Sequence, residues 1–165
     1  MIQEANLPWY YLDTENNLIM PNYTLECLRW ISKEVKKNWS VFEYGSGYSS
    51  IWWRSKCGYS AVESNEPWAR AMNVKHEPDK QLYIQGCWSC IQWDCIVVDG
   101  IHRQECIEYC MPYIKPGGFL IIDNYDETDS VDDWVKIDEM LSTWTKAIFR
   151  QHNHTDWKTA VFKKP

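Results

Sequence analysis

The chain of 165 residues lacks both long hydrophobic runs and a surplus of positive charge. Its uninterrupted apolar stretches reach only four residues, as at 95–98 and 119–122, whereas a membrane-spanning helix needs about 20. With 17 Lys and Arg against 23 Asp and Glu, the formal net charge is −6. Proteins that bind nucleic-acid phosphates carry a basic surplus, so we expect neither a membrane span nor nucleic-acid binding.

Signals for secretion and for a second folded domain are also missing. The segment around Glu4 has neither the basic nor the apolar part of a secretory signal, and no repeat or Pro/Gly-rich linker divides the chain. We therefore expect a cytoplasmic protein with one domain at residues 22–165 and an N-terminal arm or lid at residues 1–21. The sequence gives no indication of oligomeric state.

The seven cysteines do not suggest a disulfide framework. Their number is odd, and without a secretory signal we expect reduced thiols that pack as small apolar side chains. The alternative is a structural zinc site, because Cys87-x2-Cys90 and Cys106-x3-Cys110 approach the usual pairs of ligands. Cys106 and Cys110 would share one helix face, where burial alone accounts for them.

Aromatic residues are what the chain has in excess. It contains 11 Trp, 10 Tyr and 4 Phe, which are 15% of the sequence. A disordered chain would not carry so many, and the number suffices for a core and several stacking surfaces. Trp52, Trp53 and Trp88 follow predicted strands, and residues 9–11 lie in the predicted lid, so these aromatics are candidate walls around a flat ligand.

Predicted strands and helices alternate along the chain. Strands are predicted at 40–44, 59–63, 81–85, 94–99 and 119–123, and helices at 23–37, from 51, and at 67–74, 104–113 and 131–144. Asn22 is the expected N-cap of the first helix, residues 115–118 are an expected turn, and 147–151 with 159–163 form a closing hairpin. Strands that are continuous apolar runs are typical of a parallel sheet covered on both faces, so the predicted fold class is α/β.

Glycines and carboxylates gather where the predicted strands end. These residues are Glu43 with Gly45 and Gly47, then Glu63, Gly86, Asp99 and Asp123. Ligands of open parallel sheets bind beyond the carboxyl ends of the strands, so the sequence predicts a site at this edge. Glycines allow close approach of the backbone, an acid after the second strand can bind a ribose diol, and the shared negative charge favours a cation or hydroxyl donors.

The loop Gly45-Ser46-Gly47 partly fits the dinucleotide fingerprint G-x-G-x-x-G. Ser50 stands at the third position, and Glu63 follows Gly47 by sixteen residues where the fingerprint has about 20. A nucleotide- or dinucleotide-binding Rossmann-like module without catalytic activity is therefore the alternative function.

Three segments resemble class I S-adenosylmethionine-dependent methyltransferases. Residues 41–47 (VFEYGSG) resemble their E/D-x-G-x-G cofactor loop, 61–63 (AVE) their ribose-binding acid, and 117–122 (GGFLII) their fifth strand. The resemblance spans about residues 22–165. It implies a Rossmann-like three-layer α/β/α sandwich whose seven-stranded sheet has the order 3-2-1-4-5-7-6 with an antiparallel C-terminal hairpin. It also implies S-adenosylmethionine as the cofactor, bound by Glu43, Gly45, Gly47, Tyr48, Ser49, Glu63 and Asp99. The segment after the predicted third strand departs from the family, because it lacks the acid or amide that often meets the adenine, and its candidates for cofactor binding are Gly86 and Trp88, the latter by stacking.

A finer resemblance concerns residues 98–102 (VDGIH) and 122–124 (IDN), which are similar to segments of metal-dependent catechol and sugar O-methyltransferases. It implies Asp99, Asp123 and Asn124 as Mg²⁺ ligands and His102 as the catalytic base. Oxygen ligands suit Mg²⁺, and a bound cation lowers the pKa of a coordinated hydroxyl. The expected acceptor is a hydroxyl of a small molecule or sugar, and the Asn/Asp-Pro-Pro-aromatic signature of enzymes that methylate nucleic-acid bases is absent.

Overall fold

The computed structural model describes residues 11–12, 18–127, 131–151 and 157–165. None of the helices in these ranges is long and apolar enough to cross a bilayer. In chain order the elements are β1 (Tyr11–Leu12), β2 (Leu18–Ile19), α1 (Leu25–Glu34), β3 (Ser40–Tyr44), α2 (Tyr48–Lys56), β4 (Gly58–Glu63), α3 (Glu66–Met72), β5 (Lys75–His76), α4 (Lys80–Ile84), the 3-10 turn η1 (Gln85–Cys87), β6 (Trp93–Val98), α5 (Arg103–Cys110), the 3-10 turn η2 (Met111–Tyr113), β7 (Ile114–Ile122), α6 (Trp134–Met140), β8 (Thr145–Arg150) and β9 (Lys158–Lys163).

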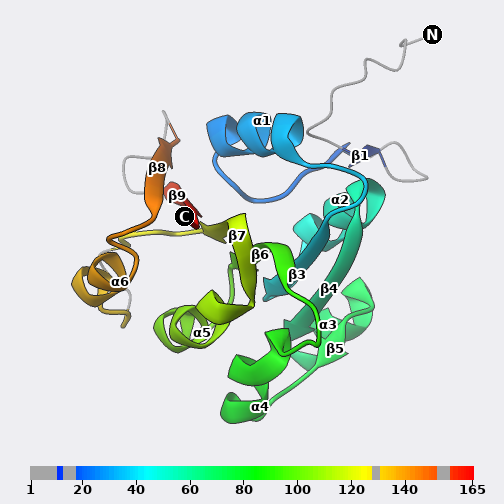
Figure 1. Ribbon diagram of the computed structural model, residues 1–165. Coiled ribbons are helices and arrows are strands. Elements are labelled where there is room, and N and C mark those ends of the chain that lie inside the picture. The colour runs from blue at the N-terminus through cyan, green and yellow to red at the C-terminus, as the bar shows by residue number, and fades with distance from the viewer. Residues whose placement is uncertain (1–10, 13–17, 128–130, 152–156) are drawn as a thin grey trace, which may run out of the picture.

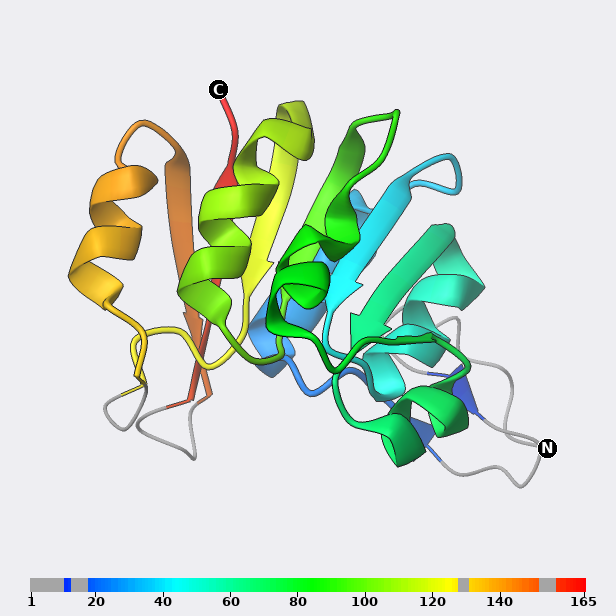
Figure 2. The same cartoon turned by 90° about the horizontal axis from the view of Figure 1, so that it is seen from below.

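Seven strands form one sheet in the order β5-β4-β3-β6-β7-β9-β8. The first five are parallel, and β9 is antiparallel to both of its neighbours. Counted within this sheet, the strand order is 3-2-1-4-5-7-6, so the predicted topology is confirmed. Figures 1 and 2 show α1 and α2 on one side of the sheet and α5 and α6 on the other, which gives the three layers.

Apolar residues on both faces of the sheet form two separate cores. On β3, Phe42 and Tyr44 belong to the cluster with α4, α5 and α6, whereas Val41 belongs to the cluster with α1 and α2. Successive side chains of a strand point to opposite faces, so a strand buried on both faces has no polar alternation. Trp52 and Trp53 are fully buried in the second cluster and therefore serve as core, not as walls of a ligand site.

The prediction of a strand at 81–85 is wrong, because this segment forms α4 and the start of η1. The Asp79 side chain caps α4 by accepting a hydrogen bond from the Leu82 amide at 3.0 Å. Tyr83 and Ile84 are buried while Leu82 is 52% exposed, which is the one-sided burial of a helix. The third strand of the sheet is instead β5, whose two residues are both exposed and so carry no apolar signal.

Other boundaries differ locally. The expected turn at 115–118 lies within β7, beside a register shift between Trp93 and Cys95 of β6. Thr24, not Asn22, is the N-cap residue of α1, and α2 already begins at Tyr48. In the predicted arm, β1 and β2 pair as a short antiparallel ribbon. Trp9 and Tyr10 of the predicted lid lie outside the described residues, as do residues 128–130 and 152–156.

Candidate active site

Three neighbouring strands bring the predicted site residues to one edge. Tyr44 of β3 pairs with Val98 of β6, which pairs with Ile122 of β7, so the residues that follow these strands lie side by side. The Asp99 amide donates to the Tyr44 carbonyl at 3.0 Å, and the Asp123 amide donates to the Val98 carbonyl at 3.2 Å. Figure 2 shows the parallel strands ending together at its lower edge, near the N-terminal ends of α2 and α5.

Gly45 of the glycine loop lies in close contact with the backbone of Asp99 and Gly100. Its φ of +92° lies in the left-handed region, and its amide donates to the Val62 carbonyl at 2.8 Å. A Cβ at this position would lie 2.9 Å from the Asp99 carbonyl oxygen and 3.0 Å from the Gly100 nitrogen. Glycine is required both by the backbone conformation and by the space, so the loop after β3 is pressed against the turn after β6.

Glu43 points into the interior instead of toward the open edge. Its side chain is fully buried and accepts hydrogen bonds from the Tyr23 hydroxyl at 3.0 Å, from the Tyr59 hydroxyl and from Ser50. Burial raises the pKa of this carboxyl to about 7, although the hydrogen bonds act in the opposite direction. Glu43 therefore fixes the strand beneath the glycine loop, and the tyrosines that hold it come from distant segments that no local motif connects.

Glu63 lies at the end of β4, beside the glycine loop. Its side chain is 8% exposed and accepts hydrogen bonds from the Asn65 amide at 2.8 Å and the Ser46 hydroxyl at 3.2 Å. The Trp68 indole donates to the Ser46 carbonyl and is 41% exposed, so it forms a wall next to Gly47. Sequence patterns do not single out Trp68 as a site residue, because α3 carries it to the loop only through tertiary packing.

Tyr48 and Ser49 open α2 directly after the glycine loop. Tyr48 is 48% exposed at the edge, whereas Ser49 is buried. The Gly47 amide already donates to the Ser50 hydroxyl at 3.2 Å. A dinucleotide pyrophosphate would need such amides at the start of the helix, so this bond weakens the dinucleotide alternative.

Trp88 is not brought to this edge, because it follows Cys87, whose carbonyl accepts a hydrogen bond at 2.8 Å from the indole of Trp93 at the start of β6. Gly86 packs against the face of the sheet, where an added Cβ would lie 3.0 Å from Val62 Cγ1 and 3.2 Å from Phe42 Cζ. Trp88 is 64% exposed. The residue that follows the third strand is Glu77, which is buried and whose amide donates to the Glu63 carbonyl at 2.9 Å.

Asp99 and Asp123 form an acidic pair at the ends of adjacent strands. Asp123 is 2% exposed, and its carboxylate accepts hydrogen bonds from the Thr159 hydroxyl at 2.6 Å and the Trp157 indole at 3.3 Å. Burial raises the pKa of Asp123 to about 6. Burial and then the charge of Asp123 raise the pKa of Asp99, while the Arg103 guanidinium favours the charged form of both acids.

The predicted magnesium ligands do not form an open oxygen site. Mg²⁺ requires near-octahedral coordination and keeps several waters, but both oxygens of Asp123 face protein donors. Within the described ranges, no three His, Cys, Asp or Glu side chains are grouped to hold a metal ion. The residues present therefore fit Mg²⁺ poorly.

The cysteines do not form the alternative zinc site either. Cys90 is exposed, whereas Cys87, Cys106 and Cys110 are buried, and every cysteine is a free thiol. The prediction of packed, reduced thiols is the one that agrees with this arrangement.

His102 lies at the turn between β6 and α5. Its φ of +54° is uncommon for a residue other than glycine, and such backbone strain concentrates at functional sites. The Tyr83 ring of α4 packs edge-on to the imidazole at a centroid distance of 6.4 Å. His102 lines a pocket of about 430 Å³ together with Gly100, Ile101, Arg103, Glu127, Val131 and Asp132.

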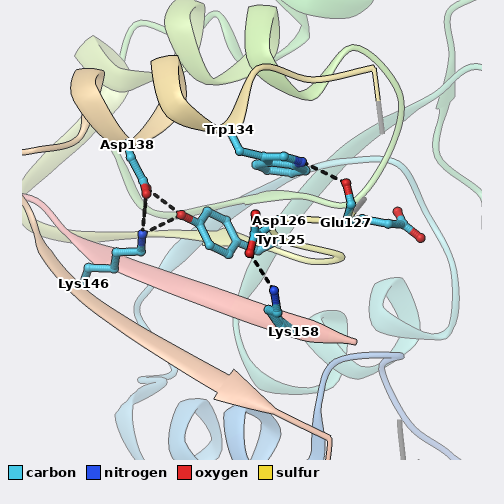
Figure 3. Close-up of polar contacts among 7 residues, drawn as sticks. All are labelled: Tyr125, Asp126, Glu127, Trp134, Asp138, Lys146 and Lys158. Atoms are coloured by element: carbon cyan, nitrogen blue, oxygen red, sulfur yellow. Dashed lines mark hydrogen bonds and ion pairs between the residues drawn. The ribbon is translucent and has the colours of Figure 1, made fainter. Parts of the chain in front are cut away.

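The loop after β7 forms the other side of this pocket and is held by a polar network (Figure 3). The Tyr125 hydroxyl donates to Asp138 at 2.6 Å, and Lys146 donates to both residues. Lys158 donates to Asp126 at 2.6 Å. Asn124 and Asp126 have φ values of +50° and +58°, so these bonds stabilise a strained loop beside His102.

The fold and this edge can be compared with known proteins. No protein-family model and no curated protein sequence matches the chain. Among solved structures, O-methyltransferase TomG from Streptomyces achromogenes, in complex with SAM, is similar at 17% identity and a TM-score of 0.58, over 78% of this chain and 74% of that one. N-methyltransferase NodS from Bradyrhizobium japonicum WM9 is similar at 12% identity and a TM-score of 0.60, over 85% and 93%.

A third solved structure is magnesium protoporphyrin IX methyltransferase ChlM from Synechocystis PCC 6803, with bound SAM. It shares 8% identity at a TM-score of 0.62, over 85% of this chain and 77% of that one. These proteins act on different acceptors, so the likeness identifies the scaffold and not the substrate. The chain has the fold of the class I S-adenosylmethionine-dependent methyltransferases.

Proposed function

We propose that the protein is an S-adenosylmethionine-dependent methyltransferase that methylates a hydroxyl of a small molecule. The observation that carries this proposal is the close approach of Gly45 to the backbone of Asp99 and Gly100, with Glu63 on the adjacent strand. The glycine loop, which would bind the cofactor, thereby lies against the turn that leads to His102. The solved structures with bound SAM support the same cofactor for this fold.

The cofactor would lie over the glycine loop. Glycines let its methionine part approach the backbone, and Glu63 would exchange its contact with Ser46 for the ribose diol. Trp68 would cover one side of the bound molecule. The sulfonium is positive, so the Glu63 carboxylate at this edge would favour the charged cofactor over its neutral product.

Methyl transfer is an in-line displacement in which the acceptor oxygen attacks the methyl carbon. The O–CH3 bond forms as the S–CH3 bond breaks, and the sulfonium leaves as the neutral thioether S-adenosylhomocysteine. His102 would accept the acceptor's hydroxyl proton, and the pocket walls would hold the oxygen in line with the methyl group. No step is assigned to magnesium, because the predicted ligands fit it poorly.

The acceptor pocket favours a small, partly apolar molecule. Ile101 and Val131 are exposed apolar side chains on its rim, and Glu127 can accept a hydrogen bond from a second hydroxyl. A sugar or a phenolic ring would fit a volume of about 430 Å³. The β1–β2 ribbon approaches α2, so we also propose residues 1–21 as the arm that covers the site.

Calorimetry tests the cofactor directly. We expect S-adenosylhomocysteine to bind and NAD not to bind. The variant Glu63→Gln should weaken binding by roughly tenfold, because it removes a charged acceptor of the ribose hydroxyls. Glu66→Gln is the matched control, since Glu66 is exposed and pairs only with Arg70 among the described contacts. Preferential binding of NAD would instead support the dinucleotide module.

Turnover tests the role of His102. With an acceptor found by screening catechols and sugars for S-adenosylhomocysteine release, His102→Gln should lower kcat by about 10²–10⁴-fold and leave cofactor affinity unchanged. A loss of cofactor affinity with normal kcat would show that His102 is structural.

A further inference from the structure

The outer edge of β4 is only partly covered by another strand. On the inner side, β3 pairs with β4 from Gly58 to Val62, whereas β5 on the outer side pairs only with Val62 and Glu63. Within the described ranges, residues 58–61 therefore have no strand partner on their outer side. Such an edge exposes backbone groups to which another strand can add, and proteins usually protect it.

The hydrogen bonds of β4 show which of its backbone groups face outward. The Gly58 amide donates to the carbonyl of Trp39, the residue before β3, at 3.0 Å. Backbone groups of successive residues in a strand point to opposite sides, so the amides of Tyr59 and Ala61 point away from β3. An added strand would pair with these two amides and with the Tyr59 carbonyl.

A cavity of about 410 Å³ lies along this edge and differs between the two faces of the sheet. Phe42 and Val62, which belong to the core on the α5 side, line it together with Gly86. On the α2 side it is lined by Arg54 and Tyr59. The cavity thus has an apolar wall on one face of the sheet and a positively charged wall on the other.

A second cavity, of about 440 Å³, extends the apolar wall. It adjoins the first, because Lys75 and Gly86 line both. Leu82 and Trp88 also line it, and both are exposed apolar side chains. Exposed apolar surface that is continuous with a free strand edge indicates a site where another chain binds.

The charge along this edge is positive. The Arg54 guanidinium donates to the carbonyls of Met72 and Asn73 at 2.7 Å and 2.9 Å, and these carbonyls carry no net charge to balance it. Lys75 adds a second cation, which pairs with Glu77 at 3.1 Å. The described residues that line the two cavities include these two cations and no acid, so the surface favours an acidic ligand.

We propose that the outer edge of β4 binds an extended peptide of a partner protein in which apolar and acidic side chains alternate. Side chains of an added strand would alternate between the two faces, the apolar ones toward Gly86 and Trp88 and the carboxylates toward Arg54. A second copy of this chain is less suited, because pairing of two β4 edges would bring like charges together.

This edge is remote from the candidate active site. Arg54 lies in the last turn of α2, whereas the glycine loop precedes the first residue of that helix. The inference therefore goes beyond the proposed methyl transfer and does not depend on it.

Residue-resolved hydrogen exchange tests the backbone pairing. The probe is a synthetic peptide of seven residues, capped at both ends, in which valine and aspartate alternate. At saturation it should slow exchange about tenfold or more at the amides of Tyr59 and Ala61. The amides of Gly58 and Ser60 point toward β3 and should not change. Equal slowing at all four amides, or at none, would contradict strand addition.

N-methylated peptides test the same pairing without any change to the protein. Alternate amides of an added strand face β4, so methylation of one alternate set should abolish binding and methylation of the other set should spare it. Binding that tolerates both methylation patterns would overturn the proposal.

Fluorescence anisotropy tests the charge preference. A peptide with lysine in place of aspartate should not bind, and Arg54→Gln should weaken binding of the aspartate peptide by about tenfold. Arg70→Gln is the matched control, because Arg70 is an exposed arginine that pairs with Glu66 on α3, and it should leave the affinity unchanged. If Arg54→Gln does not fold, the two peptides still decide on the wild type, since equal binding of both refutes an acidic ligand.

Sedimentation of the protein alone separates a peptide partner from a second copy. We expect no dimer that competes with the aspartate peptide. A dimer whose formation slows exchange at the Tyr59 amide would show that a second copy occupies the edge and would overturn the proposal.

Discussion

Gly45 shows how a single residue connects two parts of the site. Its positive φ and the 2.9 Å distance that would separate an added Cβ from the Asp99 carbonyl oxygen are two independent reasons for glycine. At Gly117 only the first reason applies, because its φ is +75° but an added Cβ would meet nothing within 4 Å. The difference in the free energy of unfolding between Gly45→Ala and Gly117→Ala therefore measures the cost of the close contact at Gly45.

We expect Gly117→Ala to lower the free energy of unfolding by about 1 kcal/mol, the cost of backbone strain. Gly45→Ala should lower it by about 2–4 kcal/mol, because the Asp99 backbone must also shift. Urea unfolding measures both values, and calorimetry with S-adenosylhomocysteine should show weaker binding only for Gly45→Ala. Equal losses of stability would mean that the contact with Asp99 does not constrain the loop.

At the scale of elements, the loop after β7 depends on α6 and β8. Tyr125 packs on Phe162 and Trp134, and its hydroxyl connects the loop to Asp138 of α6 and Lys146 of β8 (Figure 3). The C-terminal elements thus carry no predicted catalytic residue but fix the wall of the acceptor pocket.

Tyr125→Phe should lower the free energy of unfolding by about 1 kcal/mol, because the hydroxyl loses two partners while the ring remains packed. The Lys146–Asp138 ion pair stays in place, so hydrogen exchange should increase mainly at residues 124–127. Tyr109→Phe is the matched control: its hydroxyl receives one long hydrogen bond, of 3.5 Å from Tyr113, and the expected change is close to zero. A similar loss in both variants would contradict the structural role of the network.

For the whole molecule, the buried network around Glu43 joins segments from the N-terminus to β4. Tyr23 lies just before α1, Ser50 is in α2 and Tyr59 is in β4, and all three contact the carboxyl group. Because the pKa of Glu43 is raised from 4.5 to about 7 on folding, the native state binds a proton that the unfolded chain has already released.

This difference predicts the pH dependence of stability. The contribution of Glu43 is fully present below about pH 4.5 and is lost as the pH rises through 7, for a decrease of roughly 3 kcal/mol. The pKa of Asp123 is also raised, to about 6, so this residue likewise lowers the free energy of unfolding as the pH rises. Denaturant titrations between pH 4.5 and 8 should show this decline, and Glu43→Gln should flatten it. Glu139→Gln, at an exposed position, should leave the slope unchanged, and an unchanged slope in Glu43→Gln would refute the assignment.

The architecture of this protein follows largely from local patterns in its amino-acid sequence. Apolar runs such as 95–98 and 119–122 are typical of strands buried on both faces, and glycines with acids after the strands predict an edge with a ligand site. Local sequence patterns do not distinguish helix from strand in short segments that bury one face or no face. The segment with Tyr83 and Ile84 is short and apolar, which periodicity cannot assign to strand or helix, and β5 has no apolar residue.

The role of each acid, in contrast, depends on long-range packing in the folded protein. Glu43 and Asp99 both follow the strand-end pattern, yet Glu43 is held inside by two tyrosines, whereas burial and the charge of Asp123 on the adjacent strand end raise the pKa of Asp99. Tyr23 contacts Glu43 and Thr24 contacts Thr159, across 20 and 135 positions of the chain. Such long-range contacts cannot be predicted from the spacing of residues within a short segment. Whether a carboxylate is free to bind a ligand depends on its burial and on its hydrogen-bond donors, and those are supplied by the packing of distant segments.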